Sequence, residues 1–175
     1  MIQFRNTASP HLVAAIVLVF GQLAVSAQEE PREFISGQID GESTQWLVQS
    51  KPPNPSVVFS TLLPEMHSFR ITGYAGERFA REGSLTIEFN LRNGEVQDPK
   101  IRYFPFAPLH PRFSFGEDHG TGALVIDSVR IESVTAHVEG RFSGELYYHQ
   151  SPNTTPISHR THEAEIEFSV VATRQ

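Results

Sequence analysis

The stretch LTIEFNLRNGEVQDPKIRYF, residues 85–104, decides the fold class of this chain. Its first half alternates between apolar side chains (Leu85, Ile87, Phe89, Leu91) and polar ones (Thr86, Glu88, Asn90). That period of two is typical of a β-strand with one covered face. Asn93-Gly94 follows, a pair that accepts the positive φ angles of a tight hairpin turn. We therefore predict a hairpin whose return strand covers 96–104, with a bulge or a free edge at Asp98-Pro99 because proline cannot donate to a ladder.

The same alternation recurs along the rest of the chain. It is clear over 124–131, with a phase shift near Asp127-Ser128, and over 136–148 and 164–172; less regular candidates are 34–40, 45–49, 56–62 and 66–74. No window shows a helical stripe longer than two turns. The chain is therefore predicted to be all-β, a single antiparallel β-sandwich of about nine or ten strands, with a small β-barrel as the alternative. A transmembrane barrel would share the alternation, but the aromatic girdles it needs are not visible.

The first 27 residues predict where the protein works. Arg5 lies ahead of an apolar run over 12–25, and Val25-Ser26-Ala27 supplies the small residues of a cleavage site. This order is typical of a secretory signal peptide, and the run is shorter than the ~20 residues of a spanning helix. We expect cleavage near Ala27, no stable membrane insertion afterwards, and a periplasmic or secreted protein.

Composition narrows the remaining possibilities. The chain has no cysteine, so disulfides, thiolate metal sites and lipid attachment through a cysteine are excluded, and a bacterial envelope or secretome location fits best. Removing residues 1–27 from the 175 leaves one domain at 28–175. The net charge changes from −6 to −7, because the removed segment contains Arg5 and no acid. An acidic chain is a poor candidate for nucleic-acid binding.

Short motifs bring a resemblance to known proteins. FISGQIDG (34–41), followed by Trp46, resembles the opening strand of small bacterial exported β-sandwich proteins of unknown function. VRIESV (129–134) and VEGRFSGEL (138–146) are similar to late strands of the same proteins. The resemblance implies a β-sandwich and an envelope location, and it implies no activity. Those proteins are often lipid-anchored through a cysteine, which this chain lacks.

The stretch YFPFAPLHPRFSF, residues 103–115, is the candidate contact surface. Its prolines stiffen a loop, and aromatic rings on a preset loop can stack on a sugar or enter a groove of a partner protein. The predicted ligand-binding residues are Tyr103, Phe104, Phe106, Arg112, Phe113 and Phe115. The alternative is a loop that folds over the end of the sandwich with its aromatics in the core, where we also expect Trp46.

Histidines form the second group of candidates. We expect them to be solvated loop side chains and predict no metal site; the alternative is a metal-dependent enzyme in which a hairpin brings His149, His159 and His162 together as ligands. We expect Glu117-Asp118-His119 to form a polar turn; the alternative is that the acids orient the histidine ring and raise its basicity. Asn153-Thr154-Thr155 fits the N-glycosylation pattern, which has little meaning in a bacterial host.

No motif in the chain indicates a particular enzymatic reaction. Neither Gly-x-Ser-x-Gly nor His-Glu-x-x-His occurs, and no cofactor is indicated. We therefore expect a non-catalytic binding or structural module with a protein or glycan partner. The alternative is a metal-dependent enzyme that uses His149, His159 and His162. The ligand, the biological process and the oligomeric state stay open.

Overall fold

All regular secondary structure in the described part of the chain is β-strand. The computed structural model describes residues 33–77, 79–106, 110–152 and 154–175, so the predicted signal peptide, residues 107–109 and Asn153 lie outside it. The strands are β1 Phe34–Ile39, β2 Glu42–Trp46, β3 Val57–Leu63, β4 Met66–Gly73, β5 Ser84–Arg92, β6 Glu95–Phe104, β7 Arg112–Phe115, β8 Thr121–Ile131, β9 Thr135–His149 and β10 Ile157–Arg174. Over those ranges no helix is long and apolar enough to cross a membrane.

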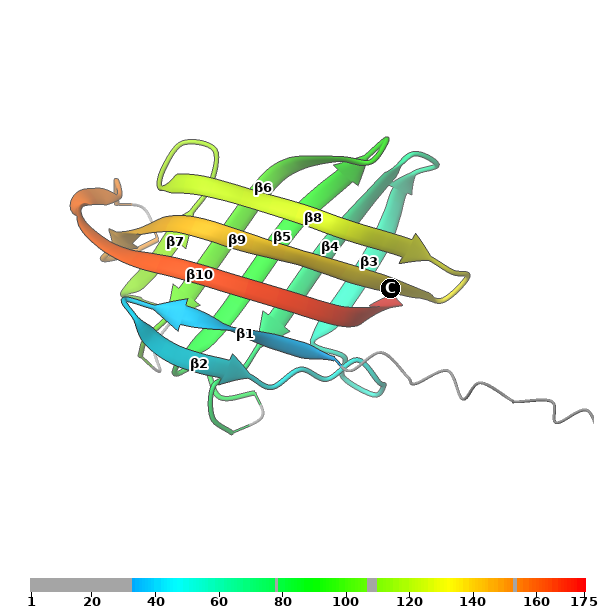
Figure 1. Ribbon diagram of the computed structural model, residues 1–175, viewed down its shortest axis with the longest axis horizontal. Helices are drawn as coiled ribbons and strands as arrows, with labels where there is room; N and C mark the ends of the chain where they lie inside the picture. The colour runs from blue at the N-terminus through cyan, green and yellow to red at the C-terminus, as the bar shows by residue number, and fades with distance from the viewer. Residues whose placement is uncertain (1–32, 78, 107–109, 153) are drawn as a thin grey trace, which may run out of the picture.

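The strands form two layers that share one hydrogen-bonded sheet. Strands β2, β1, β10, β9 and β8 form one layer, and β3 to β7 form the other, which crosses behind it (Figure 1). All pairings are antiparallel except a short parallel contact in which Thr173 and Arg174 of β10 meet Val58 and Phe59 of β3. The predicted all-β, sandwich-like fold is confirmed, and the parallel contact is the one pairing that alternation did not predict.

Two strands join the layers because each changes partner along its length. Strand β10 pairs with β1 over 164–169 and then with β3 at its C-terminal end. Strand β9 pairs with β8 over 136–145 and with β7 over 147–149. The pairings therefore close a circuit through β3, β4, β5, β6, β7, β9 and β10, and the two layers are bonded to each other at two corners.

The hairpin that decided the fold class forms as predicted. Asn93 and Gly94 have φ angles of 52° and 83°, and they join β5 to β6. Asp98 has a φ of 50°, and the β5–β6 register shifts between Glu88 and Asn90, so the predicted bulge is present. One expectation was wrong: part of the predicted 103–115 loop is β7, a four-residue strand that pairs with β6 and β9.

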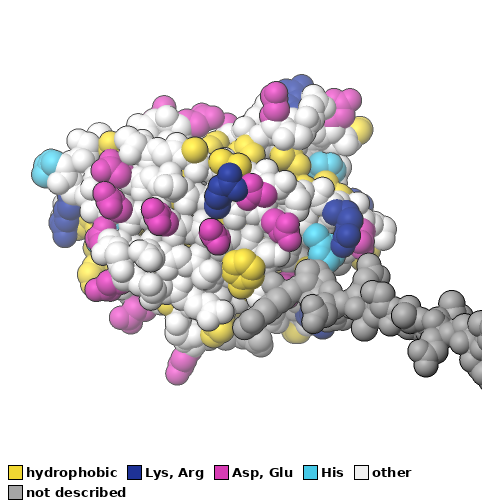
Figure 2. Space-filling model, in the orientation of Figure 1, with side chains coloured by type: hydrophobic (Ala, Val, Ile, Leu, Met, Phe, Trp, Pro, Cys, Tyr) yellow, Lys and Arg dark blue, Asp and Glu magenta, His cyan; other side chains and the backbone are white. Residues whose placement is uncertain are grey.

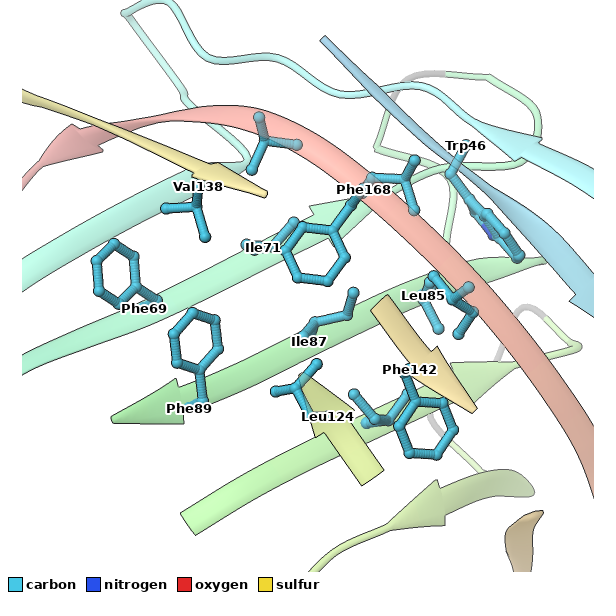
Figure 3. Close-up of a cluster of buried hydrophobic side chains, with 14 of the residues drawn as sticks. Trp46, Phe69, Ile71, Leu85, Ile87, Phe89, Leu124, Val138, Phe142 and Phe168 are labelled. Atoms are coloured by element: carbon cyan, nitrogen blue, oxygen red, sulfur yellow. The ribbon is translucent and has the colours of Figure 1, made fainter. Parts of the chain in front are cut away.

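Aromatic side chains from both layers fill the core. Phe59, Phe69 and Phe89 share one register row of β3, β4 and β5, and their neighbouring ring centroids are 5.7 and 5.0 Å apart. Phe142 and Phe168 enter from the other layer (Figure 3). Trp46 is 1% exposed, as expected of a core residue, and its Nε1 donates to the carbonyl oxygen of Gly83 at 2.8 Å. The core is thus one continuous apolar layer between the two groups of strands.

Paired glycines let β8 and β9 approach closely. Gly122 and Gly144 lie opposite each other in the register. A Cβ atom on Gly144 would collide with the backbone carbonyl oxygen of Thr121. Backbone cannot move aside as a flexible side chain can, so glycine is required at this position.

We predict that Gly144→Ala lowers the free energy of unfolding by roughly 1–3 kcal/mol, because β8 must separate from β9 to admit the methyl group. Urea denaturation followed by tryptophan fluorescence measures this loss. The matched control is Gly76→Ala, since a Cβ there has no neighbour within 4 Å. Equal stability of the two variants would contradict the close approach.

Candidate functional site

The structure separates the six residues predicted to bind a ligand. Phe104, Phe113 and Phe115 are buried, so their rings do not reach solvent. Phe106 is 53% exposed, while Tyr103 and Arg112 are half-buried. Most aromatic rings of this stretch therefore pack into the end of the sandwich. Among its described residues, Phe106 is the aromatic residue classed as exposed.

Alternation along β7 sends its side chains to two different environments. Phe113 faces the core, where its ring lies 5.4 Å from the Tyr148 ring and 3.7 Å from the His162 ring. Arg112 and Ser114 face the other way, as the period of two requires. Their register partners on β9 are His149 and Tyr147.

A polar cluster gathers on this second face of β7. Arg112 lies opposite His149 in the register, and the Ser114 hydroxyl is 3.0 Å from Nε2 of His119. The rings of His119 and His149 meet edge to face with centroids 4.9 Å apart. His110 completes the group, because its positive charge would act on His149. We call His110, Arg112, Ser114, His119 and His149 the Arg112 cluster.

The turn after β7 holds His119 in place. The backbone N–H of Gly116 donates to the carbonyl oxygen of His119 at 2.8 Å, and that of His119 donates back at 3.3 Å. The His119 ring then packs over Gly116, where a Cβ atom would lie 3.1 Å from its Cε1. Glycine at 116 therefore makes room for the imidazole that contacts Ser114.

Three nitrogen atoms of the cluster are buried without a partner. Nδ1 of His110, Nε of Arg112 and Nε2 of His149 have no hydrogen bond to any described residue. Arg112 takes part in no ion pair within the described ranges, whereas neighbouring Arg102 is held by Glu88 at 2.7 Å. A buried polar group without a partner costs about 1–3 kcal/mol, and more if it is charged. Nε of Arg112, which can only donate, therefore lacks an acceptor.

Burial, and after it the neighbouring positive charges, lowers the pKa values of the cluster. Burial, followed by the charges of His119, Arg112 and His110, lowers the pKa of His149 to about 4. Burial and then Arg112 also lower the pKa values of His110 and His119, and Asp118 opposes this only for His119. Burial and Arg102 lower the pKa of Arg112 itself. Each added proton is therefore disfavoured, first because the groups are removed from water and then because Arg112 and the other imidazoles would repel the new charge.

Part of the cluster is accessible to solvent. Arg112, His110 and His119 are half-buried, and His149 is buried behind them. Guanidinium and imidazole N–H groups are donors, and a guanidinium binds carboxylate or phosphate oxygens in a bidentate geometry. Chemically, the arrangement fits a small anionic group.

The histidines of the metal hypothesis do not converge. His149 belongs to the Arg112 cluster, whereas His162 contacts Phe113 on the core side and hydrogen-bonds to Asp40. His159 is exposed, in a register irregularity of β10 between Ile157 and Thr161. No group of three or more His, Asp or Glu side chains within the described ranges could hold a metal ion.

Sequence reasoning singled out Arg112, His119 and His149 separately and missed His110 and Ser114. For Glu117-Asp118-His119 it weighed a polar turn against acids that orient the ring; the His119 ring contacts the Ser114 hydroxyl. Ser114 could have been predicted from the sequence, because it lies two residues from Arg112 and residues at that spacing share one face of a strand. The approach of His119 to His149 depends on tertiary structure.

Comparison with known proteins identifies no relative. No family model matches the chain, and no curated protein or solved structure is significantly similar to it. The resemblance to small exported β-sandwich proteins therefore stays a prediction, and the site rests on its geometry.

We predict opposite effects from two phenylalanine substitutions in the 103–115 stretch. Phe113→Ala should lower the free energy of unfolding by about 3–5 kcal/mol, because it leaves a cavity beside Tyr148 and His162. Phe106→Ala should change it by less than about 0.5 kcal/mol, since that ring is exposed. Thermal and urea denaturation measure both. A stable Phe113→Ala protein would contradict its place in the core.

We predict that His149 makes the protein less stable in acid. Its folded pKa of about 4 lies below the 6.5 of a free imidazole, so between these values the unfolded chain binds more protons. Stability attributable to His149 is therefore complete above pH 6.5 and decreases as the pH falls toward 4. The loss is on the order of 1–3 kcal/mol.

Urea denaturation at pH 7 and pH 4.5 tests this prediction. The difference between the two pH values should be smaller in His149→Asn than in the unmodified protein. His159→Asn is the matched control, because His159 is exposed, and it should keep the full difference. A full difference in His149→Asn would show that His149 is not held neutral by its surroundings.

Proposed function

We propose that this protein is an exported, non-catalytic binding module whose Arg112 cluster binds a small anion or the anionic group of a larger ligand. The observation that supports it best is the buried, unpartnered Nε of Arg112 in a cluster without an acid partner. Arg112 was among the residues predicted to bind a ligand. The proposal keeps that role for Arg112 and moves the binding surface from the aromatic rings to the opposite face of β7.

Electrostatics favours an anion over a neutral ligand. The cluster contains one arginine and three histidines, with Arg102 beside them. Glu88 is engaged by Arg70 and Arg102, and Asp118 acts on His119. A bound carboxylate or phosphate would supply an acceptor to Nε of Arg112 and would offset its positive charge, which is the charge of the cluster while its histidines are neutral. A neutral ligand would do only the first.

The geometry supports binding more than catalysis. Ser114 and His119 form a hydroxyl–imidazole pair of the kind that activates nucleophiles. The Ser114 residue is only 2% exposed, however, so its hydroxyl is shielded from a substrate. Its hydrogen bond therefore fits a positioning role, in which it fixes the His119 ring beside His149.

Export is the second part of the proposal. It rests on the charge, apolar run and small-residue site of residues 1–27 and on the absence of cysteine. A periplasmic or secreted module would meet free anions and the anionic groups of glycans or other proteins. The proposed ligand of the Arg112 cluster is therefore a carboxylate or phosphate group, either free or attached to a glycan or protein.

We expect Arg112→Gln to weaken anion binding at least tenfold, because it removes the only guanidinium of the cluster. Isothermal titration of the purified chain with inorganic phosphate and with acetate, in low-salt buffer, measures the two dissociation constants. Arg92→Gln makes the same change of charge at an exposed position outside the cluster and should leave binding unchanged.

The pH dependence of binding has a defined sign. A bound anion raises the pKa values of His110, His119 and His149, so binding takes up protons and should tighten as the pH falls from 8 to 6, by at most about tenfold per unit for each proton taken up. Absence of saturable binding of both anions at 10 mM, or equal binding by both arginine variants, would refute the proposed site.

A further inference from the structure

A small pocket lies on the outer face of the layer that β3 to β7 form. Alternation along β4 and β5 sends Ile71 and Ile87 into the core, so Thr72 and Thr86, which pair across the two strands, face outward. The pocket has a volume of about 280 Å³, and the buried Phe104 borders it. Its other lining residues come from the end of β4, the start of β5 and their connection: Thr72, Tyr74, Phe79, Arg81, Ser84 and Thr86. A volume of this size suits one small ring rather than an extended chain.

Two neighbouring aromatic rings belong to this lining. Tyr74 and Phe79 meet edge to face with ring centroids 5.6 Å apart, and Phe79 is 49% exposed. The backbone of Phe79 has a φ of 66°, a conformation that a bulky residue rarely adopts. Such strain persists only where the surrounding structure maintains it, and it is concentrated at functional sites. A strained backbone therefore holds an exposed aromatic ring at the pocket.

Hydrogen bonds fix the chain on both sides of Phe79. The N–H of Tyr74 donates to the carbonyl oxygen of Leu47 at 3.0 Å, and the N–H of Leu47 donates back at 2.8 Å. Further along the chain, the N–H and the hydroxyl of Ser84 both donate to the carbonyl oxygen of Arg81, at 2.9 and 2.7 Å. The lining is thus held in place by the protein itself, and a ligand would not have to order it.

The polar groups of the lining are suited to hydroxyl groups of a ligand. Thr72 and Thr86 are half-buried, and each hydroxyl can donate and accept a hydrogen bond. Burial raises the pKa of Tyr74, and the positive charge of Arg81 opposes this rise, so the guanidinium lies near the phenol. Arg81 is the one charged residue of the lining, and it forms no ion pair with any residue that the structure describes.

We propose that this pocket binds one pyranose ring of a glycan. A pyranose has an apolar C–H face, which packs on the electron-rich face of an aromatic ring, and a rim of hydroxyl groups. The C–H face would contact Phe79, and the rim would hydrogen-bond to Thr72, Thr86 and Arg81. The Arg112 cluster contributes no residue to the pocket, so this proposal stands independently of anion binding.

The mixed lining distinguishes a sugar from other occupants. An aromatic side chain of a partner protein would contact the rings but leave the threonine hydroxyls and Arg81 without partners, which costs binding energy. An inorganic anion would use Arg81 and leave the rings unused. The other outer face of the molecule differs in character, because exposed acids follow β9 and β10 there (Figure 2): Glu139, Glu163, Glu165 and Glu167.

The probes are methyl β-D-glucopyranoside, methyl β-D-galactopyranoside and methyl α-D-mannopyranoside, titrated into the ¹⁵N-labelled chain and followed by two-dimensional NMR. We expect at least one of them to bind saturably with a dissociation constant of about 1–10 mM, the range for a ligand of this size. The amide signals of Thr72 and Thr86 should shift on binding. The signal of His149, in the Arg112 cluster, should not.

Substitutions then test the contacts. Phe79→Leu should weaken binding at least fivefold, because it keeps an apolar side chain but removes the aromatic face, whereas Phe79→Tyr should retain binding. Phe106→Leu is the matched control, since Phe106 is similarly exposed and lies outside the lining, and it should leave binding unchanged. Thr86→Val removes one hydroxyl at nearly constant shape and should weaken binding at least threefold, which tests the site even if Phe79→Leu fails to fold.

Three results would overturn the proposal. One is the absence of a saturable shift with all three glycosides at about 50 mM, and another is full binding by folded Phe79→Leu or Thr86→Val. The third is tighter binding of N-acetyltyrosinamide at the same amides, which would assign the pocket to an aromatic side chain of a partner protein. Phosphate binding should be unchanged in Phe79→Leu, so the loss of one site is distinguishable from the loss of the other.

Discussion

The β9–β10 ladder is the interaction on which the rest of the structure depends. It runs from Thr135 opposite Thr173 to Tyr148 opposite Ile157, and both strands are long enough to change partners on their outer sides. Through β10 the ladder connects to β3, and through β9 it connects to β7. Both corners of the sandwich, and hence the single core between the layers, follow from this one pair of strands. The Arg112 cluster also follows from it, because His149 reaches Arg112 only where β9 leaves β8 and pairs with β7.

Much of the fold could be predicted because its signals are local. Alternation over 85–91 and 136–148 depends only on which face of a strand is covered, and Asn93-Gly94 fixes its hairpin through backbone preference alone. Strand β7 was missed because three prolines precede it and only Phe113 and Phe115 mark its period of two. The parallel contact of β10 with β3 was beyond sequence reasoning, since it joins residues more than a hundred positions apart and no turn specifies it.

The sequence identified single residues of the Arg112 cluster as candidates, but it did not predict that they lie together. Arg112, His119 and His149 each belong to a type that binds ligands, but their meeting depends on the register of β7 with β9 and on the turn at Gly116. The proposed metal ligands failed for a related reason. Neighbouring positions on paired strands share a face, whereas the irregularity between Ile157 and Thr161 turns His159 outward and leaves His162 on the core side. A bulge changes which face of a strand the following residues occupy, and the sequence does not show where the bulge lies.

The two ends of the folded domain lie together, at the C-terminal end of β10. The carboxylate of Glu33 accepts the N–H of Val171 at 2.8 Å, and the N–H of Gln175 donates to the carbonyl oxygen of Phe59 at 2.9 Å. The Arg112 cluster lies at the far end of β9, roughly 40 Å away along the strand (Figure 1). Immobilisation through Gln175, or through a chain shortened to begin at Glu33, would thus present the cluster outward, away from the support. Because Glu33 and Gln175 lie at the same end, such a shortened domain is also suited to circular permutation, which would leave the core strands in place.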